Sequence, residues 1–276
     1  MNRSKIYILL IIFFVLLVAL PRYESLFDRK VIDDYITYYF TDYKKSLQDL
    51  GHLYGVQIVH TINGNFIRKE SQLPPRNGKA RQIEDFEIAR FSILLPLVLQ
   101  QYPAKLIGSN IRAIKLSKNL EFFGVIYGAT NTVDVIYLSS DGRNNGYTDF
   151  YIKQGFHHEF SSILMRNYNF PVQQWMEANK PGFRYLVDLD KVIDSTDKDL
   201  NLKGEEQYYQ DGVIAKYSYT NYENDFNLFA QMVFNEPERL KELVNKYPLI
   251  KQKYLIVKEF YLSISPFFAD TFSKIL

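Results

Sequence analysis

The chain has 276 residues, of which 47% are hydrophobic and 23% charged, a composition typical of a globular protein with a sizeable core. Its formal net charge is only +2, and the Lys and Arg residues are spread along the sequence, so we expect no nucleic-acid partner. There is no cysteine, which excludes disulfides, zinc–thiolate sites, cysteine nucleophiles and lipid attachment through a cysteine.

The N-terminus begins with an apolar run. Arg3 and Lys5 precede residues 6–20, which carry no charged side chain. As a helix this run would be about 22 Å long, short for a full membrane span but suited to a signal segment. We expect residues 1–22 to be a signal peptide or an uncleaved signal anchor in the membrane. The basic residues before the run predict that residues 23–276 lie outside the cytoplasm, in the periplasm or extracellularly.

The rest of the chain alternates helical and strand patterns, and then becomes helical. Helices are predicted where apolar residues recur at helical spacing or where Pro and Gly mark helix ends. These segments are residues 28–50, 83–101, 148–168, 172–178, 226–234, 235–247, 249–263 and 267–276. Strands are predicted at residues 56–59, 62–67, 111–116, 122–127 and 133–138. Pro96 should kink or split its helix. The fold class is therefore α+β, with a small antiparallel or mixed sheet and a helical C-terminal part.

The predicted helix over residues 148–168 carries the most informative motif. His158-Glu159-Phe160-Ser161-Ser162 has the outline of H-E-x-x-H, in which two histidines one turn apart bind zinc and the glutamate activates the bound water. Ser162 stands where the second histidine would be. Moving the register by one does not help, because His157 would then need a partner at Ser161.

The order of elements around this motif resembles the gluzincin type of zinc metallopeptidase, in particular a zinc-binding metallopeptidase family common in Bacteroidetes. The resemblance covers about residues 83–234 and rests on Phe156-His157-His158-Glu159-Phe160, on residues 211–217 and on Glu223-Asn224-Asp225-Phe226. It implies a zincin-like fold, a strand that edges the substrate cleft, and a third zinc ligand on a later helix. Glu223 is the acidic candidate for that ligand, although the family spacing also allows Asn224.

Each of these residues also has a structural interpretation. His158 could be a partly buried histidine bonded to a neighbouring helix or to a tyrosine, and Glu159 could bind the edge strand or an arginine. Thr220-x-x-Glu223 reads as a helix capping box, which would explain Glu223 without a metal. His157 points about 100° away round the helix and is expected outside the site.

The sequence therefore supports three hypotheses. The first is an exported or membrane-anchored pseudoenzyme: a degenerate metallopeptidase that binds a peptide or protein partner, with His158, Glu159 and Glu223 vestigial and zinc absent or weak. The alternative is an active zinc peptidase with an atypical ligand set, for which Asp188, Asp190 and Asp194 would be the further acidic candidates. The third is a structural protein whose cleft has no role.

Overall fold

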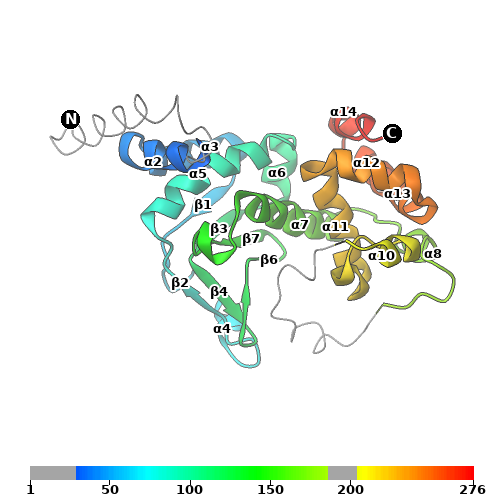
Figure 1. Cartoon of the computed structure of the whole chain (residues 1–276). Helices are drawn as coiled ribbons and strands as arrows, with labels where there is room; N and C mark the ends of the chain where they lie inside the picture. Colours follow the sequence, from blue (N-terminus) through cyan, green and yellow to red (C-terminus); the bar gives the residue numbers. More distant parts are fainter. Residues whose placement is uncertain (1–28, 186–203) are drawn as a thin grey trace.

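A computed structural model describes residues 29–185 and 204–276 (Figure 1). The expected N-terminal apolar segment and the acidic candidates at Asp188, Asp190 and Asp194 lie outside these residues. Within them, no helix is both long and apolar enough to cross a membrane. The described protein is α+β, with a small mixed sheet and a helical C-terminal part, as predicted.

The N-terminal half is built on a four-stranded sheet in the order β1-β3-β7-β6. Strands β1 (Gln57–Val59), β3 (Ala113–Ser117) and β7 (Val135–Ser139) are parallel, whereas β6 (Ala129–Asn131) runs antiparallel along the edge. A second, antiparallel sheet contains β2 (Lys79–Arg81), β4 (Asn119–Phe122) and β5 (Val125–Tyr127). β6 follows β5 directly through Gly128, so the two sheets meet at one open edge.

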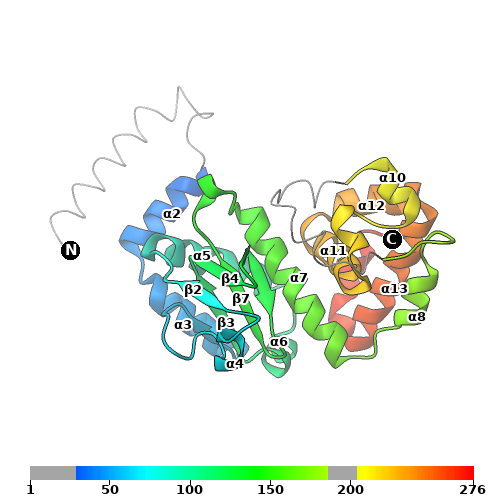
Figure 2. The ribbon, with the colours of Figure 1, turned by 90° about the horizontal axis from the view of Figure 1, so that it is seen from below.

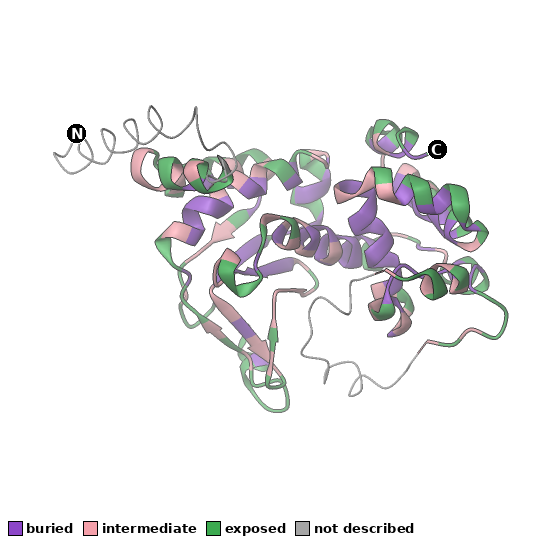
Figure 3. Ribbon diagram, in the orientation of Figure 1, coloured by how far each residue is buried: buried purple, intermediate pink, exposed green. Residues whose placement is uncertain are grey.

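The helices of this half are α2 (Arg29–Phe40), α3 (Tyr43–Tyr54), α4 (Lys69–Gln72), α5 (Asp85–Leu99), α6 (Ala104–Asn110) and α7 (Asp149–Asn167). Helical side chains form one core with Ile114, Leu116, Ile136 and Leu138 on one face of the four-stranded sheet. On the other face Phe66 and Ile67 of a loop and Leu120 of β4 pack with Ala113, Val135 and Tyr137. Every residue of β3 and β7 is buried, because the sheet is covered on both faces (Figure 3). The sequence alternation that predicted a half-buried strand at residues 111–116 was therefore misleading.

The C-terminal half is helical. Its elements are α8 (Val172–Glu177), α10 (Glu206–Asp211), α11 (Tyr222–Asn235), α12 (Pro237–Lys246), α13 (Pro248–Ile264) and α14 (Ala269–Ser273). Figure 2 shows α7 between the sheet and this helical half. α7 and α11 pack closely along their length, and both contribute largely buried side chains to a core that spans the two halves.

Some predicted elements differ in the structure. The predicted helix 28–50 is two helices, because Asp42 caps the start of α3 by accepting a hydrogen bond from Lys45 N. Residues 62–67 are a loop rather than a strand, and residues 122–127 turn at Phe123 and Gly124 to form the β4–β5 hairpin. Pro96 lies inside α5 without splitting it. Residues 129–131, expected to join strands, are the edge strand β6.

Candidate functional site

The H-E motif lies on α7 where this helix faces the edge strand. Thr148 caps the start of α7 by accepting a hydrogen bond from Tyr151 N. Gly155 permits the helix to approach β6, since a Cβ there would lie 3.0 Å from the Cβ of Ala129. The next turn of the helix therefore carries His158 and Glu159 close to the strand.

A pocket of about 210 Å³ opens at this contact. It is lined by side chains from β5, β6, α7, the 3₁₀ turn η2 (Lys216–Tyr219) and α11. His158 and Glu159 line it together with the rings of Tyr127, Tyr151 and Tyr217. A carboxyl, an imidazole and three tyrosine side chains thus line one small cavity.

Glu159 joins the helix to the edge strand. Its Oε2 accepts a hydrogen bond of 2.5 Å from Asn131 Nδ2, and only 8% of the residue is exposed. Burial raises the pKa of Glu159 to about 7, while the bond from Asn131 opposes the shift. Glu159 thus bonds to an edge strand, as one interpretation of the sequence allowed, but that strand is β6, which was expected only as a connection.

His158 is held by amides of α11. Its Nδ1 lies 3.1 Å from Gln231 Nε2, and the side chain of Asn224 also hydrogen-bonds to the imidazole. The ring is in contact with that of Tyr217, with centroids 5.9 Å apart. Burial lowers the pKa of His158 to about 4, so the imidazole is neutral at neutral pH.

Ser162, at the position of the second histidine, faces α11 and not the pocket. Asn227 Nδ2 donates a hydrogen bond of 2.7 Å to Ser162 Oγ, and Asn227 Oδ1 accepts one of 2.7 Å from Ser161 Oγ. All three residues are buried. The side chain of Asn227 therefore pairs with both serines, so the hydroxyl of Ser162 is engaged in a hydrogen bond and is not directed at a metal site.

Glu223 lies outside the pocket lining. Its Oε1 accepts a hydrogen bond of 3.1 Å from Arg166 Nη1, and Arg166 Nη2 also donates to Asn131 Oδ1. Of the two candidates for a third ligand, Asn224 is the one that contacts His158. The predicted capping box is wrong, because Asn221 caps α11 by accepting from Asn224 N.

These residues do not fit a three-ligand zinc site. Such sites use thiolate, imidazole or carboxylate ligands, but Ser162 pairs with Asn227 and Glu223 pairs with Arg166. Among residues 29–185 and 204–276, no three His, Cys, Asp or Glu residues form a group that could hold a metal.

His157 is buried elsewhere, as its position on the helix predicted. Its Nδ1 lies 2.7 Å from the hydroxyl of Tyr102, and its ring stacks on Phe234 with centroids 4.9 Å apart. Burial lowers its pKa to about 3. His157 is thus a neutral core histidine.

The sequence analysis missed the amide side chains of the site, Asn131, Asn227 and Gln231. The last two belong to a row on α11 with Asn224, in which residues three and four apart lie on one face of a helix. This row of amide side chains on one face of α11, opposite Ser161 and Ser162, was a signal that the sequence already contained.

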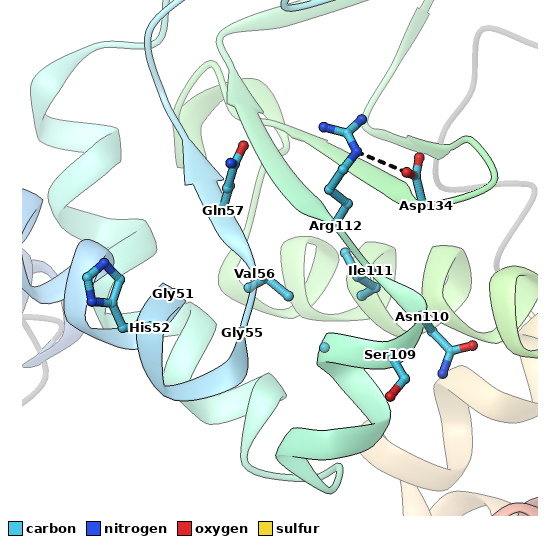
Figure 4. A pocket seen from close by; sticks show the side chains of 11 residues that line it. Gly51, His52, Gly55, Val56, Gln57, Ser109, Asn110, Ile111, Arg112 and Asp134 are labelled. Atoms are coloured by element: carbon cyan, nitrogen blue, oxygen red, sulfur yellow. Dashed lines mark hydrogen bonds and ion pairs between the residues drawn. The ribbon is translucent and has the colours of Figure 1, made fainter.

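A larger pocket of about 550 Å³ lies at the other end of the sheet (Figure 4). At its rim Arg112 Nε donates a hydrogen bond of 2.9 Å to Asp134 Oδ2, so these two charges are paired. Three glycines line it beside side chains such as His52 and Asn110. The pocket beside β6 contains a buried carboxyl, that of Glu159, whereas the carboxyl at the larger pocket is the ion-paired Asp134. We therefore take the pocket at Glu159 as the candidate functional site.

Comparisons with known proteins add nothing to this geometry. No protein-family model, no curated protein and no solved structure matches the chain.

Proposed function

We propose that this protein is a catalytically degenerate relative of zinc metallopeptidases that binds an extended peptide segment beside β6. In this proposal the fold is zincin-like, residues 1–22 export the chain or anchor it in the membrane, and the domain acts outside the cytoplasm. The observation that carries the proposal is the pocket shared by the edge strand and the helix with His158 and Glu159.

The open edge of β6 supports an extended ligand. β6 pairs with β7 on one side and is the last strand of its sheet. Ser139 N donates to Gly128 O and Thr132 N donates to Val135 O. Because hydrogen-bonded pairs alternate along an antiparallel ladder, the backbone groups of Ala129 and Asn131 point away from β7. A peptide could add to this edge as a further strand.

The pocket indicates what such a peptide would offer. Its volume of about 210 Å³ suits one large side chain, and the rings of Tyr127, Tyr151 and Tyr217 favour an aromatic or aliphatic one. Glu159 and His158 at the wall are both neutral between about pH 4 and pH 7, which lowers the cost of burying an apolar group beside them.

The replaced ligand supports loss of catalysis. Ser162 and Asn227 satisfy each other, and Asn224 stands beside His158 where an acidic ligand would be needed. A zinc enzyme keeps three protein ligands and an open position for water. We therefore assign Glu159 a binding role in this pocket.

Peptide binding tests the proposal directly. The probe is an array of blocked heptapeptides with a central Phe, Leu, Gly or Lys, applied to the full chain. Peptides with a central Phe or Leu should bind best, and Tyr217→Ala should weaken the binding of these peptides. Ala129→Pro removes one outward N–H without breaking a β6–β7 bond, and should weaken all peptides alike, while Leu53→Ala on exposed α3 should have no effect. Equal binding to wild type and both pocket variants would refute the proposal.

Zinc content tests the assigned degeneracy. We expect no stoichiometric zinc in the purified full chain after dialysis, and uptake of about one equivalent by the double variant Ser162→His, Asn224→Glu, which supplies three ligands. Stoichiometric zinc in the wild-type chain would instead support the alternative of an active peptidase with an atypical ligand set.

A further inference from the structure

Three polar side chains meet in the core of the helical half, away from the candidate site. Lys253 Nζ of α13 lies 2.5 Å from Asp225 Oδ2 of α11 and 2.6 Å from Asn179 Oδ1, just after α8. Lys253 and Asp225 are fully buried, and Asn179 is 7% exposed. The lysine amine therefore contacts both a carboxyl and a carboxamide in a buried environment.

Aromatic rings surround this group. Trp175 Nε1 donates a hydrogen bond of 3.1 Å to Asp225 Oδ2, and the hydroxyl of Tyr185 donates one of 2.6 Å to the same oxygen. Lys253 Nζ lies 4.8 Å from the centroid of the Trp175 ring and 6.0 Å from that of Phe229. These contacts fix the carboxyl beside the amine in an apolar environment.

Burial also favours the neutral forms of the pair. It lowers the pKa of Lys253 and raises that of Asp225. A proton that moves from the ammonium to the carboxylate leaves a free amine beside a carboxylic acid. The amine is then a nucleophile, and the acid can donate a proton to a neighbouring group.

We propose that Lys253 and Asn179 become joined by an amide bond between Nζ and Cγ, with Asp225 as the proton carrier. Nζ attacks Cγ of Asn179 to form a tetrahedral centre, and one proton passes from Nζ to the leaving nitrogen through Asp225. The bond from Cγ to Nδ2 then breaks and ammonia leaves. One C–N bond forms and one breaks, so the reaction needs no oxidant, reductant or cofactor.

The geometry favours Asn179 over Asp225 as the acyl partner. Asp225 Oδ2 accepts from Lys253, Trp175 and Tyr185, which holds this carboxyl for proton transfer. Asn179 is positioned by a different bond, from its Nδ2 to Met176 O at 3.0 Å. Its carbonyl oxygen lies 2.6 Å from Nζ, so the amine is next to the carbonyl group that it would attack.

The bond would link segments 74 residues apart in the sequence. It would tie the end of α8 to α13 and restrict the unfolded chain, as other covalent cross-links do. This inference is independent of the proposed peptide binding, because none of the three residues lines that pocket.

A second buried lysine provides a matched comparison. Lys115 is 7% exposed, and its Nζ donates to the backbone carbonyls of Asn65 and Phe66 at 2.9 and 2.6 Å. Neither partner is a side-chain amide or a carboxyl. Lys115 should therefore remain a free amine.

Peptide mapping of the purified, fully unfolded full chain tests the bond. Trypsin cuts after Lys and Arg but not before Pro, and a modified Lys253 resists it. We expect peptide 167–184 joined to peptide 252–258, lighter than their sum by about 17 Da, the mass of the ammonia lost. Recovery of peptide 254–258 in full yield, with no joined peptide, would overturn the proposal. Joining of 252–258 to peptide 217–239, with loss of water, would overturn the assignment to Asn179.

Variants test the role of Asp225. Asp225→Asn should lose the joined peptide while its circular dichroism stays that of a folded chain, and Lys115→Met should retain it in full. A joined peptide in Asp225→Asn would overturn the assignment of Asp225 as proton carrier. If Asp225→Asn does not fold, the wild-type map still decides whether the bond exists.

Discussion

Asn227 on α11 and Ser162 on α7 are joined by a buried hydrogen bond of 2.7 Å between the asparagine amide and the serine hydroxyl. The other end of the same amide accepts a bond from Ser161. This contact lies where α7 and α11 pack together, so the position that would carry a ligand in H-E-x-x-H instead holds two helices to each other. The residues of the candidate site are thereby also residues of the core.

Removal of this amide should destabilise the protein. Asn227→Leu leaves the buried hydroxyl of Ser162 without its amide partner and Ser161 with the backbone carbonyl of His158, and we expect a loss of about 1–3 kcal/mol in the free energy of unfolding. The triple variant with Ser161→Ala and Ser162→Ala should recover part of this loss, because no unpaired hydroxyl remains. Urea unfolding measures both. A full loss in the triple variant would contradict the hydrogen-bond explanation.

Glu159 should make stability depend on pH. Its pKa of about 7 in the folded protein lies above its ordinary value of 4.5, so its contribution to stability is complete below pH 4.5 and is lost as the pH rises through 7. Glu159→Gln removes this loss. The free energy of unfolding of the variant, relative to that of the wild type, should therefore rise by about 3 kcal/mol from about pH 4 to pH 8.

The bond from Asn131 provides the comparison for Glu159. Asn131 favours the charged carboxylate, so Asn131→Ala should raise the pKa of Glu159 and move the loss of stability to higher pH. Unfolding measured at a series of pH values checks both variants. A constant difference between Glu159→Gln and wild type across the series would show that Glu159 titrates normally.

Gly155 should be needed for the close contact between α7 and β6. Gly155→Val places a branched side chain where a Cβ alone would lie 3.0 Å from the Cβ of Ala129. We expect a loss of about 1–3 kcal/mol from overpacking, and weaker peptide binding because the strand moves away from the helix. Gly64→Ala is the control, since a Cβ there meets nothing within 4 Å. Thermal unfolding distinguishes the two.

Arg90 should be among the most sensitive charged residues. It is fully buried, and it pairs with Glu87 at 2.9 Å and with Asp149 at 2.7 Å. Arg90→Met would leave Glu87 buried without its cation and Asp149 with Arg143 as its remaining cation, at a cost of about 3–5 kcal/mol. Arg68→Met removes the exposed pair with Asp134, and should cost less than about 1 kcal/mol. Similar losses in both variants would contradict this assignment.

The amino-acid sequence alone determined the secondary structure of the long segments. Helical spacing placed α5, α7 and α13 within a few residues of their observed ends, because a repeated apolar face is a local property of the chain. It also placed His157 away from His158, since neighbouring residues on a helix point in different directions. Short strands such as β6 were missed because a three-residue strand is defined by its neighbour and not by its own pattern.

Only the tertiary structure decided what surrounds the H-E motif. The sequence could name Ser162 and Glu223, but not that Asn227 pairs with the first or that Arg166 takes the second. These partners lie 65 and 57 residues away along the chain. The packing of α7 against both β6 and α11 brings them together, and that packing depends on the whole core rather than on any single segment.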